Sequence, residues 1–234
     1  MSVIVVSGTG TEIGKTVTTA AVAALALAAG RSVAVLKPAQ TGVGPGEPGD
    51  VAEVQRLAGG RVTGAELARF PEPLAPATAA RRAGLTPVTA ADVVEAARKL
   101  AASHDLVLVE GAGGLLVHLD ESGASLADAA RELAAPVLVV TTPGLGTLNV
   151  TQLTGEALRA RGIDCLGVVI GSWPAEPGLA ERCNVAELPG VAGAPLLGAV
   201  PEGAGGLSGE EFRAAVPQWL GPELGGAWGG VSLP

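Results

Sequence analysis

A glycine-rich segment near the N-terminus has the residue types of a phosphate-binding loop. Residues 8–16 read GTGTEIGKT, so a run of glycines leads into Lys15 and Thr16. Glycines let backbone N–H groups approach a phosphate closely, and Lys15 is expected to reach the β- and γ-phosphates of a nucleotide. The Thr16 hydroxyl is the expected ligand of Mg²⁺. The strict pattern requires glycine where this chain has Thr9, so the leading Gly8 makes the loop one residue longer.

Three charged residues further along the chain could complete this site. Lys37 lies in the segment LKPAQTG at the end of a predicted strand, where a lysine is often simply solvated but could also help Lys15 to stabilise charge on a transferring phosphoryl group. Glu110 ends the apolar run LVLV and precedes GAGG, the position at which P-loop enzymes hold Mg²⁺ directly or through water. Asp50 follows a loop rich in glycine and proline, residues 41–49, and could be an oxygen ligand of the metal, the N-cap of the next helix, or both. The expected metal ligands are therefore Thr16, Asp50 and Glu110.

The elements that must position these residues alternate between short apolar runs and alanine-rich helical stretches. Uniformly apolar strands separated by helices indicate a mostly parallel sheet with helices on both faces, a doubly wound α/β fold of the P-loop NTPase type. Ligands of such sheets bind beyond the carboxyl ends of the strands, where the residues named above fall. Strands are predicted at residues 3–6, 32–36, 105–109, 136–141, 165–170 and 196–200, and helices at residues 16–29, 51–58, 90–103, 126–134, 148–160, 178–188 and 209–220.

The composition favours one globular domain and excludes several classes of partner. Residues 1–220 are expected to form a single domain, followed by a flexible C-terminal tail at residues 221–234, GPELGGAWGGVSLP. The net charge of −8 offers no basic field for nucleic acid or an anionic membrane. The apolar stretch at residues 17–29 is shorter than the roughly 20 residues that span a bilayer. No basic leader precedes the first strand, so a cytoplasmic protein is expected.

The cysteines and histidines show no catalytic or metal-binding pattern. Cys165 and Cys183 form no CxxC motif, so they are expected to be structural thiols, and His104 and His118 lack metal-ligand spacing, so they are expected to be structural or surface groups. Residues 145–149, LGTLN, follow a predicted strand and open a helix. Their backbone N–H groups suit an anion such as a substrate carboxylate, although a plain helix start explains the same residues.

Five segments together resemble the dethiobiotin synthetase family. They are GTGTEIGKT, VLKPAQTG, the acidic Asp50 after its glycine and proline loop, VEGAGGLLV and GLGTLNVTQLT, and the resemblance runs from residue 2 to about residue 202. The longer loop with Glu12 is itself a feature of that family. The resemblance implies a Mg²⁺-dependent ligase driven by ATP that carboxylates 7,8-diaminononanoate with CO₂. A carbamate forms on one amine, its oxygen attacks the γ-phosphate to give a carbamic-phosphoric anhydride, and the second amine closes the ring as phosphate leaves.

The same resemblance implies a role for individual residues and a homodimer with shared active sites. The helix start at residues 146–149 of one subunit would bind the substrate carboxylate in the site of the other. The implied catalytic residues are Lys37, Lys15 and Thr11. The implied substrate-binding residues are Thr41, Lys37, Thr11, Gly146, Thr147, Leu148 and Asn149. The implied nucleotide-binding residues are Glu12, Ile13, Gly14, Lys15, Thr16, Val17, Asp50, Glu110, Gly111, Ala112, Gly113, Gly171, Ser172, Val200, Pro201 and Glu202.

Two positions depart from the family pattern. Thr41 stands where the family commonly has serine, which keeps the hydroxyl. In VVIGSWP, Gly171 stands where an asparagine often reads the adenine edge, and glycine offers no side-chain amide. Because a lost base contact typically removes about 1–3 kcal/mol of discrimination, we predict weak selectivity among nucleoside triphosphates, with others such as CTP accepted.

Two alternative functions share the P-loop fold. Amidoligases of cobalamin synthesis normally continue into a glutaminase domain, for which this chain is too short. Partition or septum-positioning ATPases carry a second lysine near the start of the loop and often a basic surface. This chain has no lysine before Lys15 and is acidic, and it has no N-K-x-D motif of a GTPase switch. The resemblance favours the synthetase.

Overall fold

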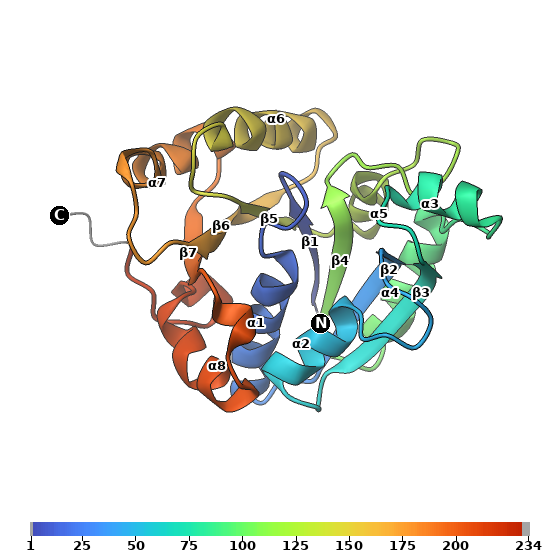
Figure 1. Ribbon diagram of the computed structural model, residues 1–234, viewed down its shortest axis with the longest axis horizontal. Coiled ribbons are helices and arrows are strands. Elements are labelled where there is room, and N and C mark those ends of the chain that lie inside the picture. The colour runs from blue at the N-terminus through green and yellow to red at the C-terminus, as the bar shows by residue number, and fades with distance from the viewer. Residues whose placement is uncertain (1, 231–234) are drawn as a thin grey trace.

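The computed structural model describes residues 2–230, which fold around one parallel β-sheet (Figure 1). Within this part of the chain, seven strands are ordered β3-β2-β4-β1-β5-β6-β7, and every neighbouring pair is parallel. The predicted doubly wound fold is therefore confirmed. The strands are β1 (Ser2–Gly8), β2 (Val33–Thr41), β3 (Thr63–Phe70), β4 (Leu106–Gly114), β5 (Val137–Thr141), β6 (Cys165–Trp173) and β7 (Leu196–Pro201).

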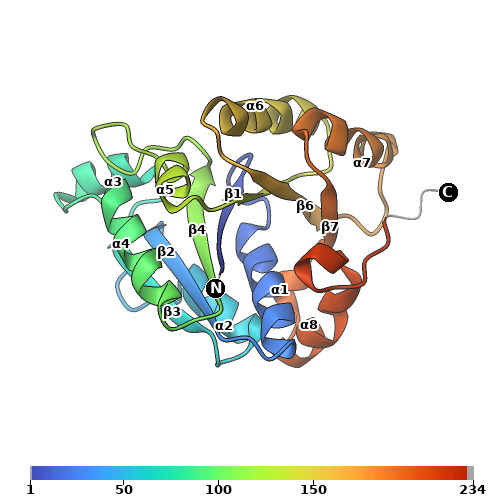
Figure 2. The same cartoon turned by 180° about the vertical axis from the view of Figure 1, so that it is seen from behind.

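Helices cover both faces of the sheet, as the opposite views in Figures 1 and 2 show. On one face lie α1 (Lys15–Ala28), α2 (Asp50–Ala58) and α8 (Gly209–Ala215). The other face is covered by α4 (Ala90–Ala101), α5 (Leu126–Leu133), α6 (Thr147–Ala160) and α7 (Leu179–Ala192), and α3 (Pro76–Ala83) packs beside the carboxyl end of β2.

The central strands are apolar throughout because both of their faces are buried. In β1, Val5 and Val6 are both completely buried, yet they belong to the two different core clusters on opposite faces of the sheet. Successive side chains of a strand point to opposite faces, so both must be apolar when each face is covered. The chain runs from β1 outward to β2 and β3 and then returns to β4 beside β1, so the carboxyl ends of β1, β2 and β4 border one crevice.

Strand β3 and helix α3 were absent from the sequence prediction, and two predicted helices end four or more residues from the predicted position. Strand β3 is an edge strand whose residues are mostly half-exposed, so its sequence TGAELARF lacks the continuous apolar run of the central strands. The short helix α3, PATAARRA, has too few large apolar residues to show a helical period. The helix expected at 209–220 ends at Ala215, shortly before Pro217, and the helix expected to end at Leu188 continues through Pro189 to Ala192.

The segment after Leu220 packs against the domain, contrary to the flexible tail expected from residue 221. Leu224 is buried in the core cluster around α1, and Trp228 packs against the cluster that includes Ile170. The Trp228 N–H donates to the Leu220 carbonyl at 3.0 Å. Two large side chains thus fasten a segment whose glycine content suggested disorder. The last part of the expected tail, residues 231–234, lies outside the described residues.

Across residues 2–230, none of the helices combines the length and the apolar character needed to cross a bilayer.

Candidate active site

The loop between β1 and α1 adopts a conformation that its glycines permit. Gly14, the N-cap of α1, has φ of 89°, in the left-handed region that favours glycine. A Cβ on Gly14 would lie 2.1 Å from the carbonyl oxygen of Gly171 on β6, so the loop also needs glycine for this close approach. Glu12 has φ of 56°, which is uncommon for a residue with a side chain. Ile13 is buried in the core and anchors the loop at this turn.

The ammonium of Lys15 is buried, and within residues 2–230 it makes one hydrogen bond, to a backbone carbonyl. Its Nζ donates to the Gly10 carbonyl at 2.6 Å. Burial, and then the nearby positive charge of Lys37, lower the pKa of Lys15 to about 8, although Glu110 and Asp50 partly oppose the shift. An anion in the loop would favour the charged form of Lys15.

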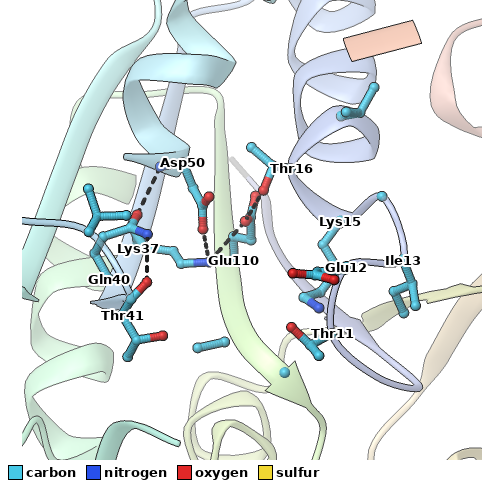
Figure 3. A pocket seen from close by; sticks show the side chains of 15 residues that line it. Thr11, Glu12, Ile13, Lys15, Thr16, Lys37, Gln40, Thr41, Asp50 and Glu110 are labelled. Atoms are coloured by element: carbon cyan, nitrogen blue, oxygen red, sulfur yellow. Dashed lines mark hydrogen bonds and ion pairs between the residues drawn. The ribbon is translucent and has the colours of Figure 1, made fainter. Parts of the chain in front are cut away.

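Lys37 lies between two carboxylates at the floor of the crevice (Figure 3). Its Nζ is 2.5 Å from Asp50 Oδ2 and 3.0 Å from Glu110 Oε1, and it also donates to the Gly111 carbonyl at 3.0 Å. Burial by itself would lower the pKa of Lys37, but the two carboxylates outweigh burial and raise the pKa above its ordinary value. Lys37 therefore stays charged at neutral pH, and the three charged groups form one connected network.

The oxygens expected to bind Mg²⁺ lie beside this network. The Thr16 hydroxyl donates to Glu110 Oε1 at 2.8 Å, which joins the start of α1 to the end of β4. The other carboxylate oxygen of Glu110, Oε2, is buried without a hydrogen-bond partner among residues 2–230. Together with Asp50, these hard oxygen donors fit Mg²⁺. No cluster of three or more His, Cys, Asp and Glu side chains that could hold a metal occurs in the described residues, so phosphate oxygens and water would complete the coordination.

These groups line a cavity of about 320 Å³, here called the phosphate cavity. A second hollow of about 580 Å³, the side hollow, continues from it and shares Thr11, Glu12, Thr41, Ala112 and Gly113. The far wall of the side hollow is mainly apolar and consists of Pro73, Leu74, Ala75, Pro76 and Val117. The full lining of the phosphate cavity is Thr11, Glu12, Ile13, Gly14, Lys15, Thr16, Val17, Lys37, Gln40, Thr41, Val43, Asp50, Glu110, Ala112 and Gly113.

Most of the residues predicted around the phosphates come together in this cavity, whereas those predicted for the base and for the substrate carboxylate do not line it. Gly111 contributes its carbonyl to Lys37. Glu202, which follows β7, donates its N–H to the Trp173 carbonyl at the end of β6. Gly205, three residues later, approaches Val17 at the start of α1. The predicted residues outside the lining are Gly111, Gly146, Thr147, Leu148, Asn149, Gly171, Ser172, Val200, Pro201 and Glu202.

Gly171 has a packing role that its sequence context did not reveal. A Cβ at this position would lie 2.0 Å from the Ile13 carbonyl oxygen and 2.6 Å from Val140 Cγ1. Glycine therefore lets β6 approach the backbone of the phosphate-binding loop.

The start of α6 is held by buried threonine hydroxyls. Thr141, at the end of β5, is 2.8 Å from the Thr147 hydroxyl, 2.9 Å from that of Thr151 and 3.1 Å from that of Thr9. Asn149 is exposed, and the adjoining Leu145 has 91% of its surface accessible. The helix start predicted to bind a carboxylate is thus partly exposed and does not line the phosphate cavity of its own chain.

The histidines have surroundings that fit their expected structural roles. His104 contacts the Leu100 carbonyl and the Thr63 hydroxyl through its two ring nitrogens, and the backbone of His118 pairs with Ser125. Cys165 and Cys183 are both free thiols.

Two residues of the cavity were missed from the sequence, Gln40 and Val43. Both lie within two residues of Thr41, which was predicted. The rule that ligands bind after the ends of strands would have included them, but neither carries a charge that drew attention to it.

Comparison with known proteins identifies close relatives over almost the whole chain. A family model described as an AAA domain matches residues 2–205. The chain is 70% identical over 228 residues to the ATP-dependent dethiobiotin synthetase BioD of Streptomyces avermitilis, covering 97% of this chain and 95% of the relative. It is 67% identical to that of Streptomyces coelicolor, with 97% and 95% covered, and 65% identical to that of Saccharopolyspora erythraea, with 97% and 99% covered.

Solved structures with the same fold are more distant in sequence. A ParA family ATPase from Chlorobium tepidum has a TM-score of 0.59 at 16% identity, covering 96% of this chain and 94% of that one. The MinC:MinD cell division protein complex from Aquifex aeolicus contains a chain with a TM-score of 0.58 at 14% identity, covering 92% and 86%. At this identity the likeness shows the fold alone.

Proposed function

The chain belongs to the family of ATP-dependent dethiobiotin synthetases, and from this premise we propose how its two connected cavities divide the reaction. It is a ligase of biotin biosynthesis that consumes ATP. The partition-type ATPase and the cobalamin-type amidoligase considered from the sequence are excluded by the 65–70% identity of its full-length relatives. One observation carries the proposal: two lysines and three oxygen donors, from separate segments, converge on a cavity that opens into a hollow with an apolar wall.

The phosphate cavity binds the triphosphate of ATP. The backbone N–H groups of the loop and the start of α1 face the phosphates, and Lys15 pairs with the terminal ones. Glu12, Ile13, Gly14 and Val17 form the surrounding wall. Support comes from the lowered pKa of Lys15, because a buried ammonium with no carboxylate of its own gains most from an anionic ligand.

We assign the Mg²⁺ that accompanies ATP to Thr16, Asp50 and Glu110. The ion would neutralise charge on the phosphates during transfer. The orphaned Oε2 of Glu110 supports this assignment, because a buried carboxylate oxygen without a partner is costly unless a ligand satisfies it. In the free protein, Lys37 pairs with both Glu110 and Asp50 and compensates one of their two negative charges.

The side hollow receives 7,8-diaminononanoate, whose hydrocarbon chain suits the wall formed by Pro73, Leu74 and Val117. Its amines would lie near Thr11 and Thr41, at the junction with the phosphate cavity. One amine adds to CO₂ and loses a proton to give the carbamate. A carbamate oxygen then attacks the γ-phosphorus, and ADP leaves. Attack of the second amine on the carbamoyl carbon closes the ring and releases phosphate.

Lys37 and Lys15 stabilise the negative charge that this sequence of steps develops. Lys37 is fixed in the phosphate cavity by Asp50, Glu110 and the Gly111 carbonyl, so its ammonium can meet the carbamate oxygen as that oxygen approaches the phosphorus. Fixed charges of this kind need no rearrangement during the reaction.

We also propose that two copies of the chain share their active sites. Leu116, Val117, Val150, Leu153 and Ala157 line an apolar groove between the segment after β4 and helix α6, and Leu153 has 57% of its surface accessible. Covering such a groove with a second copy would bury apolar surface. It would also bring residues 146–149 to the side hollow of the other copy, where their N–H groups would bind the substrate carboxylate.

The base of the nucleotide and the cellular compartment complete the proposal. No asparagine amide is available at Gly171 to read the base, so nucleotides other than ATP, such as CTP, are expected to support the reaction as well. We place the enzyme in the cytoplasm. Both cysteines are free thiols, which suits a reducing compartment, and the reaction consumes ATP, which the cytoplasm provides.

A direct assay tests these assignments. The purified protein is supplied with diaminononanoate, bicarbonate, Mg²⁺ and one nucleoside triphosphate, and dethiobiotin is measured by mass. Product is expected with ATP and is expected to disappear when Mg²⁺ is removed by a chelator. Competition between ATP and CTP measures base selectivity, and a strong preference for ATP would overturn the predicted weak selectivity.

A further inference from the structure

Helix α2 begins with a residue of the site but has no ordinary cap. Its N-cap is Gly49, which has no side chain, and its first residue is Asp50. The first N–H groups of a helix have no partner inside the helix and normally require a side chain next to them in sequence. The position of the Asp50 carboxylate depends on how this helix start is held.

The missing cap comes from strand β2. The Oε1 atom of Gln40 accepts a hydrogen bond from the Asp50 N–H at 2.8 Å, and the Gln40 side chain is 4% exposed (Figure 3). Gln40 lies three residues after Lys37 on the same strand. One strand therefore contributes both the ammonium that pairs with the Asp50 carboxylate and the amide that binds the Asp50 backbone.

Arg69 of strand β3 holds the loop that leads into this helix. Gln40 and Arg69 are paired in the ladder between β2 and β3. The Nη1 atom of Arg69 donates to the carbonyls of Gly44 and Glu47, at 3.1 Å and 2.6 Å. Its guanidinium is oriented in turn by Glu66, with contacts at 2.7 Å and 2.9 Å.

Glycine at position 49 makes room for both side chains. A Cβ there would lie 2.6 Å from Gln40 Oε1 and 2.9 Å from Arg69 Nη2. The backbone of Gly49 is extended, with φ of −104°, so any residue could adopt it. A side chain at position 49 would therefore have to push aside the ends of Gln40 and Arg69, so the position favours glycine for space and not for its conformation.

We propose that Gln40 is a positioning residue, which caps α2 from the neighbouring strand and thereby directs the Asp50 carboxylate toward Lys37 and the metal site. Gln40 acts through Asp50 and does not itself take part in the chemistry. The proposal rests on the roles of Asp50 and Lys37 given above.

Amide hydrogen exchange tests the cap without reference to catalysis. The Asp50 N–H begins a helix, so its protection depends on Gln40. Gln40→Met keeps the size of the side chain and removes the acceptor, and exchange at Asp50 is expected to quicken by about two- to tenfold, the effect of losing one hydrogen bond. Gln55→Met is the matched control, because Gln55 binds the Val62 carbonyl at the other end of α2. Equal exchange at Asp50 in wild type and Gln40→Met would overturn the proposal.

Gly49→Ala provides a second variant with an intact Gln40. Its methyl group would displace the Gln40 amide, so the same rise in Asp50 exchange is expected. Gly60→Ala, where a Cβ meets nothing within 4 Å, is the control and should leave exchange unchanged. An unchanged Gly49→Ala would contradict the proposed contact.

The link to the metal site is tested by the Mg²⁺ concentration that half-saturates nucleotide binding. Gln40→Met should raise this concentration by about two- to tenfold, and Gln55→Met should not. In an Asp50→Asn background, Gln40→Met should have no further effect, whereas additive effects would show that Gln40 acts elsewhere. If Asp50→Asn leaves the Mg²⁺ requirement unchanged while Gln40→Met still quickens exchange at Asp50, the metal role of Asp50 fails and the cap stands.

Discussion

Replacing Lys37 with methionine tests the charge network at the centre of the site. The Lys37 ammonium is 2.5 Å from Asp50 and 3.0 Å from Glu110, and the side chains of Lys37 and Glu110 are 4% and 1% exposed. Methionine fills a similar volume and carries no charge. Two carboxylates would then face each other, and the charges of Lys15 and, for Asp50, of Arg69 would compensate them only in part.

The expected loss of stability follows from this burial. Removing one partner of a buried ion pair costs about 3–5 kcal/mol, because the remaining charge stays buried without compensation. For a protein of this size, that corresponds to a fall in Tm of about 10 °C. Because the pKa of Lys37 is raised in the folded protein, its contribution is fully present below its ordinary pKa of 10.5 and is lost only as pH rises above that value.

The same variant is expected to separate binding from chemistry. Lys15 and the loop remain, so the affinity for ATP should change little, whereas loss of a fixed charge at the reacting atoms should lower kcat by about 100-fold or more. Millimolar Mg²⁺ should raise the Tm of Lys37→Met more than that of the wild type, because the ion no longer competes with the lysine for Asp50 and Glu110.

Thermal denaturation, calorimetry and the dethiobiotin assay provide the three measurements. Lys99→Met is the control, since Lys99 is an exposed lysine on α4 and its loss should affect none of them. Near-normal turnover in Lys37→Met would refute its catalytic role. A Tm equal to that of the control would refute the buried ion network.

Three further predictions concern other parts of the site. Because the pKa of Lys15 is about 8 in the free protein, ATP binding should be accompanied by the uptake of about half a proton at pH 8 and of very little at pH 6. Calorimetry in buffers of different ionisation enthalpy measures this proton uptake, and Lys15→Met should abolish it. Gly171→Ala should cost about 1–3 kcal/mol of stability and weaken nucleotide binding, because its methyl group would meet the Ile13 carbonyl. An unchanged denaturation curve together with an unchanged KM for the nucleotide would contradict this packing. Leu153→Glu should shift the protein to monomers in sedimentation and reduce synthesis, whereas Leu179→Glu, at another exposed leucine, should do neither.

The central part of the fold could be predicted because its residues face apolar surroundings on both sides. Strands β1, β4 and β5 each contain a run of four consecutive valine, leucine or isoleucine residues, which is typical of a buried strand. Strand β3 was not predicted, because an edge strand is paired on one side only and tolerates a mixed polar and apolar sequence such as TGAELARF. Its importance comes from Arg69, whose role depends on pairing with β2 and is invisible until the strands are aligned.

The phosphate side of the site could also be predicted, since the fold rule brings the ends of β1, β2 and β4 together. Thr16, Lys37 and Glu110 are far apart in sequence and are joined by hydrogen bonds and an ion pair in the structure. The interpretation of Gly171 was less complete. The sequence suggested a missing amide, and the structure adds a close approach between β6 and the loop that any side chain would obstruct.

Gln40 shows why some positioning residues stay hidden in a sequence. The usual rule looks for a cap immediately before a helix, and before Asp50 it finds only Gly49. The acceptor lies ten residues earlier on a strand, and its partner is a backbone N–H that has no sequence signature. A helix that lacks a local cap and yet begins with a carboxylate of the site therefore requires an acceptor from elsewhere in the fold. In this chain the strand that carries Lys37 supplies it, so the two groups that hold Asp50 both come from β2.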